Sequence, residues 1–228
     1  MRKSILTLAL LLLCFAFKGV LLDPPQPPAH RPAGSFDTAR AVARLQRILG
    51  DQRPHPVDSP ANDAVRDRLI AELRGIGLEP SIQDAVDCSA MPKSRGVSCS
   101  RVRNVIATIG DGPGKHLLLN AHYDSTPTGP GAADDGVGVA TLLEIASLVK
   151  GSRPARPVTF LFNEGEEFGL NGASAFVRQH PLANNVDALI NIEARGVSGP
   201  ALMFETSEPN GMQLPSSGRR QRGPTPTH

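Results

Sequence analysis

The sequence predicts an α/β domain in which helices cover both faces of a central β-sheet. Two observations support this prediction. Apolar residues with helical spacing alternate along the chain with short apolar runs that are typical of strands. These runs lack the polar alternation of a half-exposed strand, as expected when both faces of a sheet are covered. The pattern occupies residues 35–210, which we assign to the domain.

Three helices are predicted from apolar residues that recur every three or four positions. They span Phe36–Leu49, Asn62–Ile76 and Gly136–Val149. Gly50 and Gly77 follow the first two segments, and glycine at this position is a helix stop signal. The third segment is apolar around most of its circumference, so we expect that helix to be buried.

Short apolar runs between and after these helices predict the strands of the sheet. They are Arg103–Ile109, His116–Asn120, Pro157–Phe162 and Ala188–Ile192, with Leu202–Glu205 as a further candidate. Residues 110–114 connect the first two strands and are rich in glycine, which is typical of a turn.

Residues 1–22 are predicted to be a signal sequence or a membrane anchor. Arg2 and Lys3 precede an unbroken apolar run from Ile5 to Phe17, and a basic flank before such a run is typical of both. No clean cleavage site follows, so we favour an uncleaved anchor with its N-terminus inside. Residues 23–34 contain five prolines and are expected to form an extended linker. The domain would then be exported, either membrane-anchored or secreted or periplasmic.

The composition argues against nucleic-acid binding. The chain has 24 basic and 22 acidic residues and a net charge of +2, whereas phosphate binding requires a clustered basic excess. Aromatic residues make up 4% of the chain, so surfaces that stack on bases are not expected. The basic excess comes from residues 211–228, which contain three arginines and no acidic residue and are predicted to be a disordered tail.

Cys88 and Cys99 are the two cysteines within the domain. In an exported protein such a pair is a candidate disulfide. A zinc site built from this pair is less consistent with the sequence, because no second Cys/His pair has suitable spacing.

Potential metal ligands follow the predicted strands. His122 and Asp124 come after His116–Asn120, and residues two apart in an extended segment point to the same side. His122 could therefore bind a metal while Asp124 holds its other ring nitrogen. Taken alone, this pair is equally consistent with a hydrogen-bonded structural histidine.

Carboxylates occupy three further positions at the start of a predicted helix or just after a predicted strand. Asp134 and Asp135 begin the third helix, residues 164–167 include three glutamates after Pro157–Phe162, and Glu193 follows Ala188–Ile192. Helix capping or a solvated loop would explain each group singly. Because strand ends of an α/β sheet converge on one edge, we expect the groups to meet. One imidazole with several carboxylates suits zinc, manganese or cobalt.

In this order, the motifs resemble those of the co-catalytic di-zinc exopeptidases, the family of bacterial leucyl aminopeptidase and aminopeptidase Y. The resemblance is closest to the vacuolar membrane protease-like branch and covers about residues 36–210. It is carried by SPAND, RVRNVIA, NAHYDS, GAADDGVG, FNEGEEFGLNGA and NIEARGVSGPALMFET. It implies a mixed, mainly parallel central sheet flanked by helices, and a zinc-dependent exopeptidase, most simply an aminopeptidase acting on peptides or proteins.

The resemblance also implies the metal ligands, with two zinc ions in a complete site. His122 matches a ligand of the first zinc, and Asp134 matches the carboxylate that bridges both ions. Glu167 matches a ligand of the second zinc, and Glu193 matches the remaining carboxylate on the first.

The same resemblance assigns two catalytic roles. Glu166 matches the general base that takes a proton from the attacking water and passes it to the leaving amine. Asp124 matches the partner that orients His122. The second zinc of the family also has a histidine ligand well downstream, whereas the only histidine after Glu193 is His228. We therefore expect a chain truncated at its C-terminus, with an incomplete fold and impaired activity.

Two other functions remain open at this point. The first is a non-catalytic, membrane-tethered module that binds peptides or proteins on the same fold, which the missing histidine favours. The second is a single-zinc acyltransferase similar to glutaminyl cyclases. The expected partners are a peptide or protein substrate and, through the N-terminal segment, a membrane; no nucleic-acid partner is expected.

Overall fold

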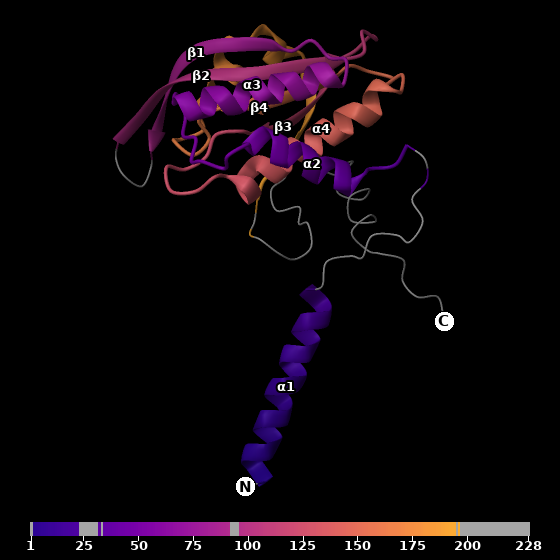
Figure 1. The fold of residues 1–228 in the computed structure, drawn as a ribbon, viewed down its shortest axis with the longest axis vertical. Coiled ribbons are helices and arrows are strands. Elements are labelled where there is room, and N and C mark those ends of the chain that lie inside the picture. Colours follow the sequence, from indigo (N-terminus) through magenta and orange to yellow (C-terminus); the bar gives the residue numbers. More distant parts are fainter. Residues whose placement is uncertain (1, 23–31, 33, 92–95, 195, 197–228) are drawn as a thin grey trace. The chain divides into compact units, whose positions relative to one another are not determined.

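The computed structural model describes residues 2–22, 32, 34–91, 96–194 and 196. The chain divides into two units, which are described separately. One contains helix α1 (Arg2–Leu22), and the other is the domain within Pro28–Val197 (Figure 1). The candidate strand Leu202–Glu205 and the tail 211–228 lie outside the described residues, as does most of the linker.

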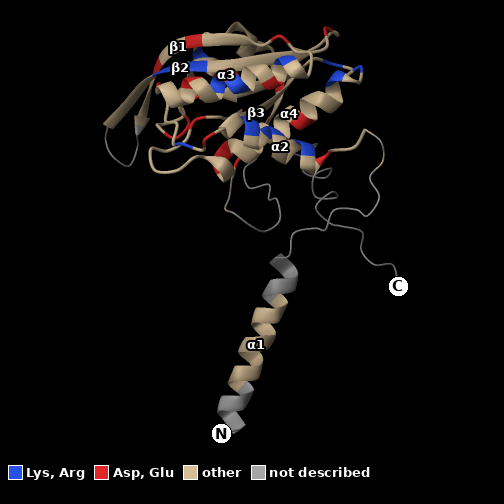
Figure 2. Cartoon of the chain, in the orientation of Figure 1, with Lys and Arg blue, Asp and Glu red and all other residues tan. Residues whose placement is uncertain are grey.

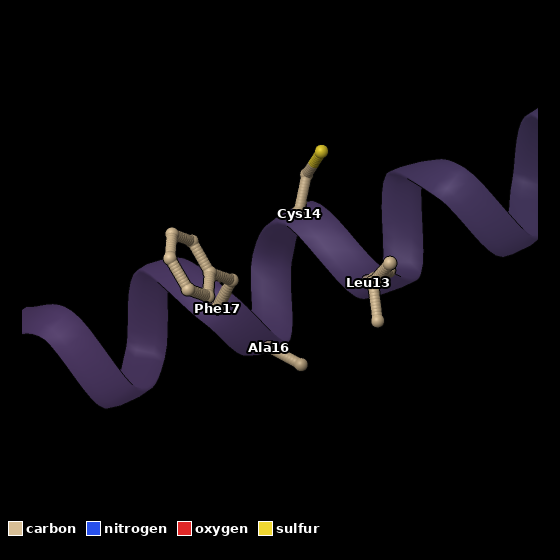
Figure 3. Close-up of a pocket in the computed structure, with 4 residues that line it drawn as sticks. All are labelled: Leu13, Cys14, Ala16 and Phe17. Carbon is tan, nitrogen blue, oxygen red and sulfur yellow. The ribbon is translucent and has the colours of Figure 1, made fainter.

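Helix α1 coincides with the predicted signal or anchor. Its described side chains, at residues 7–17, are exposed. Four of them, Leu13, Cys14, Ala16 and Phe17, line a shallow apolar hollow on the helix surface (Figure 3). Within the part of the chain that the structure describes, no helix combines the length and the apolarity needed to cross a membrane.

The domain is built on a five-stranded sheet in the order β1-β2-β4-β3-β5. The strands are β1 (Ser81–Met91), β2 (Gly96–Ile109), β3 (His116–His122), β4 (Val158–Asn163) and β5 (Val186–Asn191). β1 with β2 and β2 with β4 are antiparallel, whereas β4 with β3 and β3 with β5 are parallel. The predicted mixed sheet is confirmed, with the described pairings divided equally between the two directions.

Helices pack on both faces of this sheet, which confirms the predicted α/β architecture (Figure 1). They are α2 (Thr38–Leu49), α3 (Pro60–Gly75), α4 (Val137–Lys150) and α5 (Asn171–Gln179). Phe160 and Phe162 of β4 pack into the main core with α2, α3 and α4, while Leu161 points to the opposite face and meets Phe176 of α5. Every residue of β4 is buried, which explains why its sequence shows no polar alternation.

Capping residues account for two of the helix starts that differ from the predicted ones. The carboxylate of Asp37 accepts a hydrogen bond from the main-chain N–H of Arg40, so α2 begins at Thr38. The hydroxyl of Ser59 accepts one from Asn62, so α3 begins at Pro60, two residues before the predicted start. Ser and Asp are favoured at this position because they satisfy main-chain donors that the first helical turn leaves unpaired.

Helix α2 is bound to α4 through a buried carboxylate. Glu144 of α4 is fully buried and accepts hydrogen bonds from the main-chain N–H of Asp37, at 3.0 Å, and from Arg40 Nε, at 2.8 Å. Arg44 Nε lies 3.7 Å from the same carboxylate. Figure 2 shows the basic segments of α2 next to the acidic segment of α4.

Among the described strands and longer helices, two were not predicted. β1 and α5 are absent from the sequence-based interpretation. Cys88 in β1 and Cys99 in β2 lie directly opposite each other in the β1–β2 hairpin and form the expected disulfide. β2 and β3, which the turn at residues 110–114 connects, are not neighbours in the sheet, because β4 lies between them.

Candidate metal centre

The predicted site residues gather at the edge where the three parallel strands end. His122 is the last residue of β3 and lies opposite Asn163, the last residue of β4. Glu166 and Glu167 follow β4, and Glu193 follows β5. Because β3, β4 and β5 run in the same direction, their carboxyl ends bring these side chains together.

His122 is buried at the centre of the group. Its Nε2 lies 3.1 Å from Asp134 Oδ1, 3.7 Å from Glu193 Oε1 and 3.9 Å from Glu166 Oε2. The sequence-based hypothesis is consistent with this arrangement, because three predicted site carboxylates face one nitrogen of the predicted histidine ligand.

Two sets of three residues have donor atoms close enough to hold a metal ion among the described residues. One set contains His122, Glu166 and Glu167, and the other contains His122, Asp135 and Glu193. Asp134, predicted to bridge two ions, belongs to neither set, although its carboxylate contacts His122. Its side chain is 57% exposed. Of the predicted ligands, His122 is therefore grouped with Glu167 in one set and with Glu193 in the other, whereas Asp134 contacts His122 without belonging to either set.

Asp124 contacts both His122 and the loop that carries Glu166 and Glu167. The Nδ1 of His122 lies 3.0 Å from the main-chain carbonyl oxygen of Asp124 and 3.4 Å from its carboxylate. The carboxylate also accepts hydrogen bonds from the main-chain N–H groups of Glu166, at 3.1 Å, and Glu167, at 3.3 Å. Asp124 thus contacts the ring that it was predicted to orient, and in addition it holds the loop that follows β4.

Asp135 joins β3 to the start of α4. Its buried carboxylate accepts hydrogen bonds from the N–H of Gly138, at 3.1 Å, and from the N–H of His122, at 3.2 Å. A Cβ atom at position 138 would lie 2.2 Å from Asp135 Oδ1, so only glycine leaves room for this contact. The GAADDGVG motif therefore combines an exposed carboxylate, Asp134, with a buried one that anchors the helix.

Burial and crowding shift the acid–base properties of the carboxylates. Burial raises the pKa of Glu166 to about 7 and that of Asp135 to about 8. Burial, reinforced by the nearby Asp134, also raises the pKa of Glu167. Burial acts in the same sense on Glu193, but the hydrogen bonds to His122 and from the main-chain N–H of Ala194, together with the charge of His122, outweigh it and lower the pKa of that carboxyl.

The pKa of the His122 imidazole is also raised, but here burial works against the shift. Burial disfavours the charged ring, but the hydrogen bonds to Asp124 and Glu193 outweigh it and raise the pKa of His122 to about 12. One imidazole nitrogen surrounded by carboxylate oxygens is a ligand set that zinc accepts. Burial first, and then neighbouring carboxylates, raise the pKa of Glu166, Glu167 and Asp135, and a bound cation would favour their ionised forms. The residues present therefore fit a zinc ion.

A comparison with protein-family models finds one match, to "Peptidase family M28", over residues 104–221. This segment is just over half of the chain and contains every predicted ligand and catalytic residue.

Curated relatives match most of the chain. It is 37% identical over 203 residues to a vacuolar membrane protease of Eremothecium gossypii, an alignment that covers 80% of this chain and 20% of the relative. It is 33% identical over 205 residues to a vacuolar membrane protease of Schizophyllum commune, covering 87% and 22%, respectively. The chain thus spans about a fifth of the length of these relatives.

Solved structures with the same fold include two kinds of protein. A Zn-dependent exopeptidase from Parabacteroides distasonis superposes with a TM-score of 0.66 and 22% identity, covering 82% of this chain and 73% of the other. A glutaminyl cyclase from Porphyromonas gingivalis superposes with a TM-score of 0.60 and 26% identity, covering 71% and 60%. The first likeness confirms the predicted fold.

Proposed function

Since the chain belongs to peptidase family M28, we propose that its domain provides the metal centre of a zinc-dependent exopeptidase, specifically an aminopeptidase. The observation that supports this most strongly is the arrangement around His122, whose Nε2 faces Asp134, Glu166 and Glu193 within 4 Å. The proposed substrate is the N-terminal residue of a peptide or protein.

Four side chains would hold the zinc ions. His122, Asp134 and Glu193 would bind the first ion, and Asp134 with Glu167 would bind the second. When bound, zinc polarises the carbonyl group of the bond to be cleaved and lowers the pKa of a water molecule.

Glu166 is proposed as the general base. Its pKa of about 7 allows it to accept a proton from the attacking water near neutral pH. The same carboxyl then donates this proton to the nitrogen of the peptide bond, so that the shortened peptide leaves as a neutral amine. Asp124 supports both steps, because it contacts the ring of His122 and binds the main-chain N–H of Glu166.

The similarity to the Porphyromonas gingivalis glutaminyl cyclase favours a second candidate function. In that case the domain would transfer the side-chain acyl group of an N-terminal glutamine of the substrate to the α-amino group of the same glutamine, with release of ammonia. A third candidate is a non-catalytic module on the same fold that binds peptides or proteins without turnover.

We further propose that the N-terminal segment directs export. Helix α1 begins with Arg2 and Lys3 and continues as an apolar run, and the curated relatives carry the name vacuolar membrane protease. The domain would then lie outside the cytoplasm, which is consistent with the Cys88–Cys99 disulfide.

An assay with paired substrates tests these alternatives. The zinc-loaded chain is incubated with aminoacyl p-nitroanilides and, separately, with a peptide that begins with glutamine. Release of p-nitroaniline without cyclisation supports the aminopeptidase. Cyclisation without release would replace it with the acyltransferase, and peptide binding without either reaction would favour the binding module.

A further inference from the structure

A buried glutamate that carries no role in the proposed reaction lies two residues before the general base. Glu164 follows β4 directly, and its side chain has no exposed surface. It belongs to neither set of possible metal ligands. A fully buried carboxylate is costly unless hydrogen bonds satisfy its oxygens, so its contacts indicate its purpose.

One oxygen of Glu164 binds the segment that leads into α3. Oε1 accepts a hydrogen bond of 2.6 Å from Asn62 Nδ2 and one of 3.1 Å from the main-chain N–H of Asp58. Asn62 is itself buried, and Ser59 caps the helix that carries it. The SPAND motif, which contributes no side chain to the metal centre, is therefore connected to the centre through Glu164.

The other oxygen binds the two neighbouring strands. Oε2 accepts a 2.5 Å hydrogen bond from the main-chain N–H of Arg103 in β2. The hydroxyl of Tyr123, just after β3, lies 3.1 Å from Oε2 and 2.8 Å from the carbonyl oxygen of Arg103. Burial, together with the Glu164 carboxylate, raises the pKa of Tyr123, which keeps its hydroxyl protonated as a donor.

The main chain of Glu164 is held as firmly as its side chain. Its N–H donates to Asn104 Oδ1 at 3.1 Å, and Asn104 Nδ2 donates to the carbonyl oxygen of Gly172 at 2.8 Å. A Cβ atom at position 172 would lie 2.0 Å from the carbonyl oxygen of Glu164, so the start of α5 packs directly on this residue. Asn104 belongs to the RVRNVIA motif, which has no side chain among the metal ligands.

We propose that Glu164 is a positioning residue, which holds the β4–α5 loop so that Glu166 and Glu167 face His122. This inference rests on the proposed function, which it extends by giving the SPAND and RVRNVIA segments a part in the site. Its geometric basis is that the side-chain oxygens of Glu164 receive donors from three separate segments. With Glu164 held, the next residues of the loop can place their N–H groups on the Asp124 carboxylate.

The test compares Glu164→Gln with the unmodified chain. Each side-chain oxygen of Glu164 accepts hydrogen bonds from two donors. The amide replaces one of these oxygens with an NH2 group, so the two donors that bind that oxygen lose their acceptor. Hydrogen exchange of individual amides is followed by NMR in the metal-free chain. We expect the amides of Glu166 and Glu167 to exchange about tenfold faster, as when a buried hydrogen bond is lost, while the amides of β3 keep their rates.

Zinc affinity, measured by competition with a chromophoric chelator, is the second readout. It is expected to fall about tenfold in Glu164→Gln, in proportion to the loosening of the loop. Asp84→Asn is the matched control: Asp84 is an exposed carboxylate on β1 that pairs with Arg101, and its removal should change neither readout.

Unchanged exchange at Glu166 and Glu167 in a folded Glu164→Gln chain would overturn the proposal. So would faster exchange spread over all core amides, which indicates a general loss of stability. If Glu164→Gln does not fold, Asn62→Ala decides, because it removes one donor and is expected to give the same local change at smaller size. A wild-type chain that binds no zinc would contradict the proposed function, while the exchange rates would still decide the role of Glu164.

Discussion

Glu166 shows how the position of a residue on the sheet edge shapes its chemistry. It follows the buried strand β4 closely enough for burial to raise its pKa to about 7, yet its side chain keeps partial access to solvent. A carboxyl with this pKa can accept and return a proton near neutral pH, which an ordinary exposed glutamate does poorly.

Replacing Glu166 with glutamine tests this role. The amide cannot accept the proton, so hydrolysis of aminoacyl p-nitroanilides is expected to fall by about 100-fold or more. Zinc content, measured by mass spectrometry, should stay at the wild-type level, because His122, Asp134 and Glu193 remain. Wild-type hydrolysis in Glu166→Gln would remove this residue from the base role.

Gly138 is a second residue whose effect can be predicted. Alanine there would meet the Asp135 carboxylate at 2.2 Å and displace it from both of its N–H donors. Loss of the cap costs about 1 kcal/mol, and leaving a buried carboxylate unpaired adds about 1–3 kcal/mol. Together these costs of about 2–4 kcal/mol exceed the gain of about 1 kcal/mol in helix propensity, so Gly138→Ala should lower the free energy of unfolding in urea.

Gly151→Ala is the matched control for this substitution. Gly151 ends the same helix, its φ of −78° is accessible to alanine, and the nearest atom to an added Cβ lies 3.7 Å away. Its stability should therefore stay close to that of the wild type. Equal stabilities for the two variants would contradict the assigned role of Asp135.

At the scale of the elements, the packing of α2 on α4 depends on one carboxylate, that of Glu144. Glu144→Gln would leave Arg40 and Arg44 without their buried negative partner. Removing one member of a buried ion pair costs about 3 kcal/mol, and we expect a loss of that order in urea unfolding at pH 7. Glu79→Gln, which breaks the exposed pair with Arg74, should show no measurable change.

The same carboxylate predicts a pH dependence. Burial opposes ionisation of Glu144, but the hydrogen bonds from Arg40 and from the main-chain N–H of Asp37, together with the charges of Arg40 and Arg44, outweigh it and lower the pKa of this carboxyl in the folded chain. The stability that it contributes is therefore fully present above the unfolded-state value of about 4.5 and is lost as the pH falls below it. Glu144→Gln should reduce the slope of stability against pH in this acidic range; an unchanged slope would contradict the argument.

Strands β3 and β4 could be predicted because buried parallel strands are continuous apolar runs. β1 could not be predicted, because it is a polar edge strand that the hairpin and the Cys88–Cys99 disulfide hold in place. α5 has only 9 residues, too few for a clear helical period. The insertion of β4 between β2 and β3 depends on tertiary pairing, which no local pattern records.

Across the whole domain, the candidate site was easier to predict than the sheet order. His122, Glu166, Glu167 and Glu193 each lie at or soon after the end of a strand, so one rule about sheet edges brings them together. The role of Glu164 could not be predicted in the same way. Its partners come from residues 58–62, 103 and 123, which only the folded chain brings together.

The metal centre as a whole is tested most directly by zinc binding at neutral pH. The metal-free chain and His122→Ala are dialysed against zinc at equal concentrations, and bound metal is determined by mass spectrometry. We predict stoichiometric zinc on the wild-type chain and its loss from His122→Ala, because both sets of possible ligands share this imidazole. A wild-type chain without zinc, or a His122→Ala chain that binds as much as the wild type, would contradict the assignment of the site.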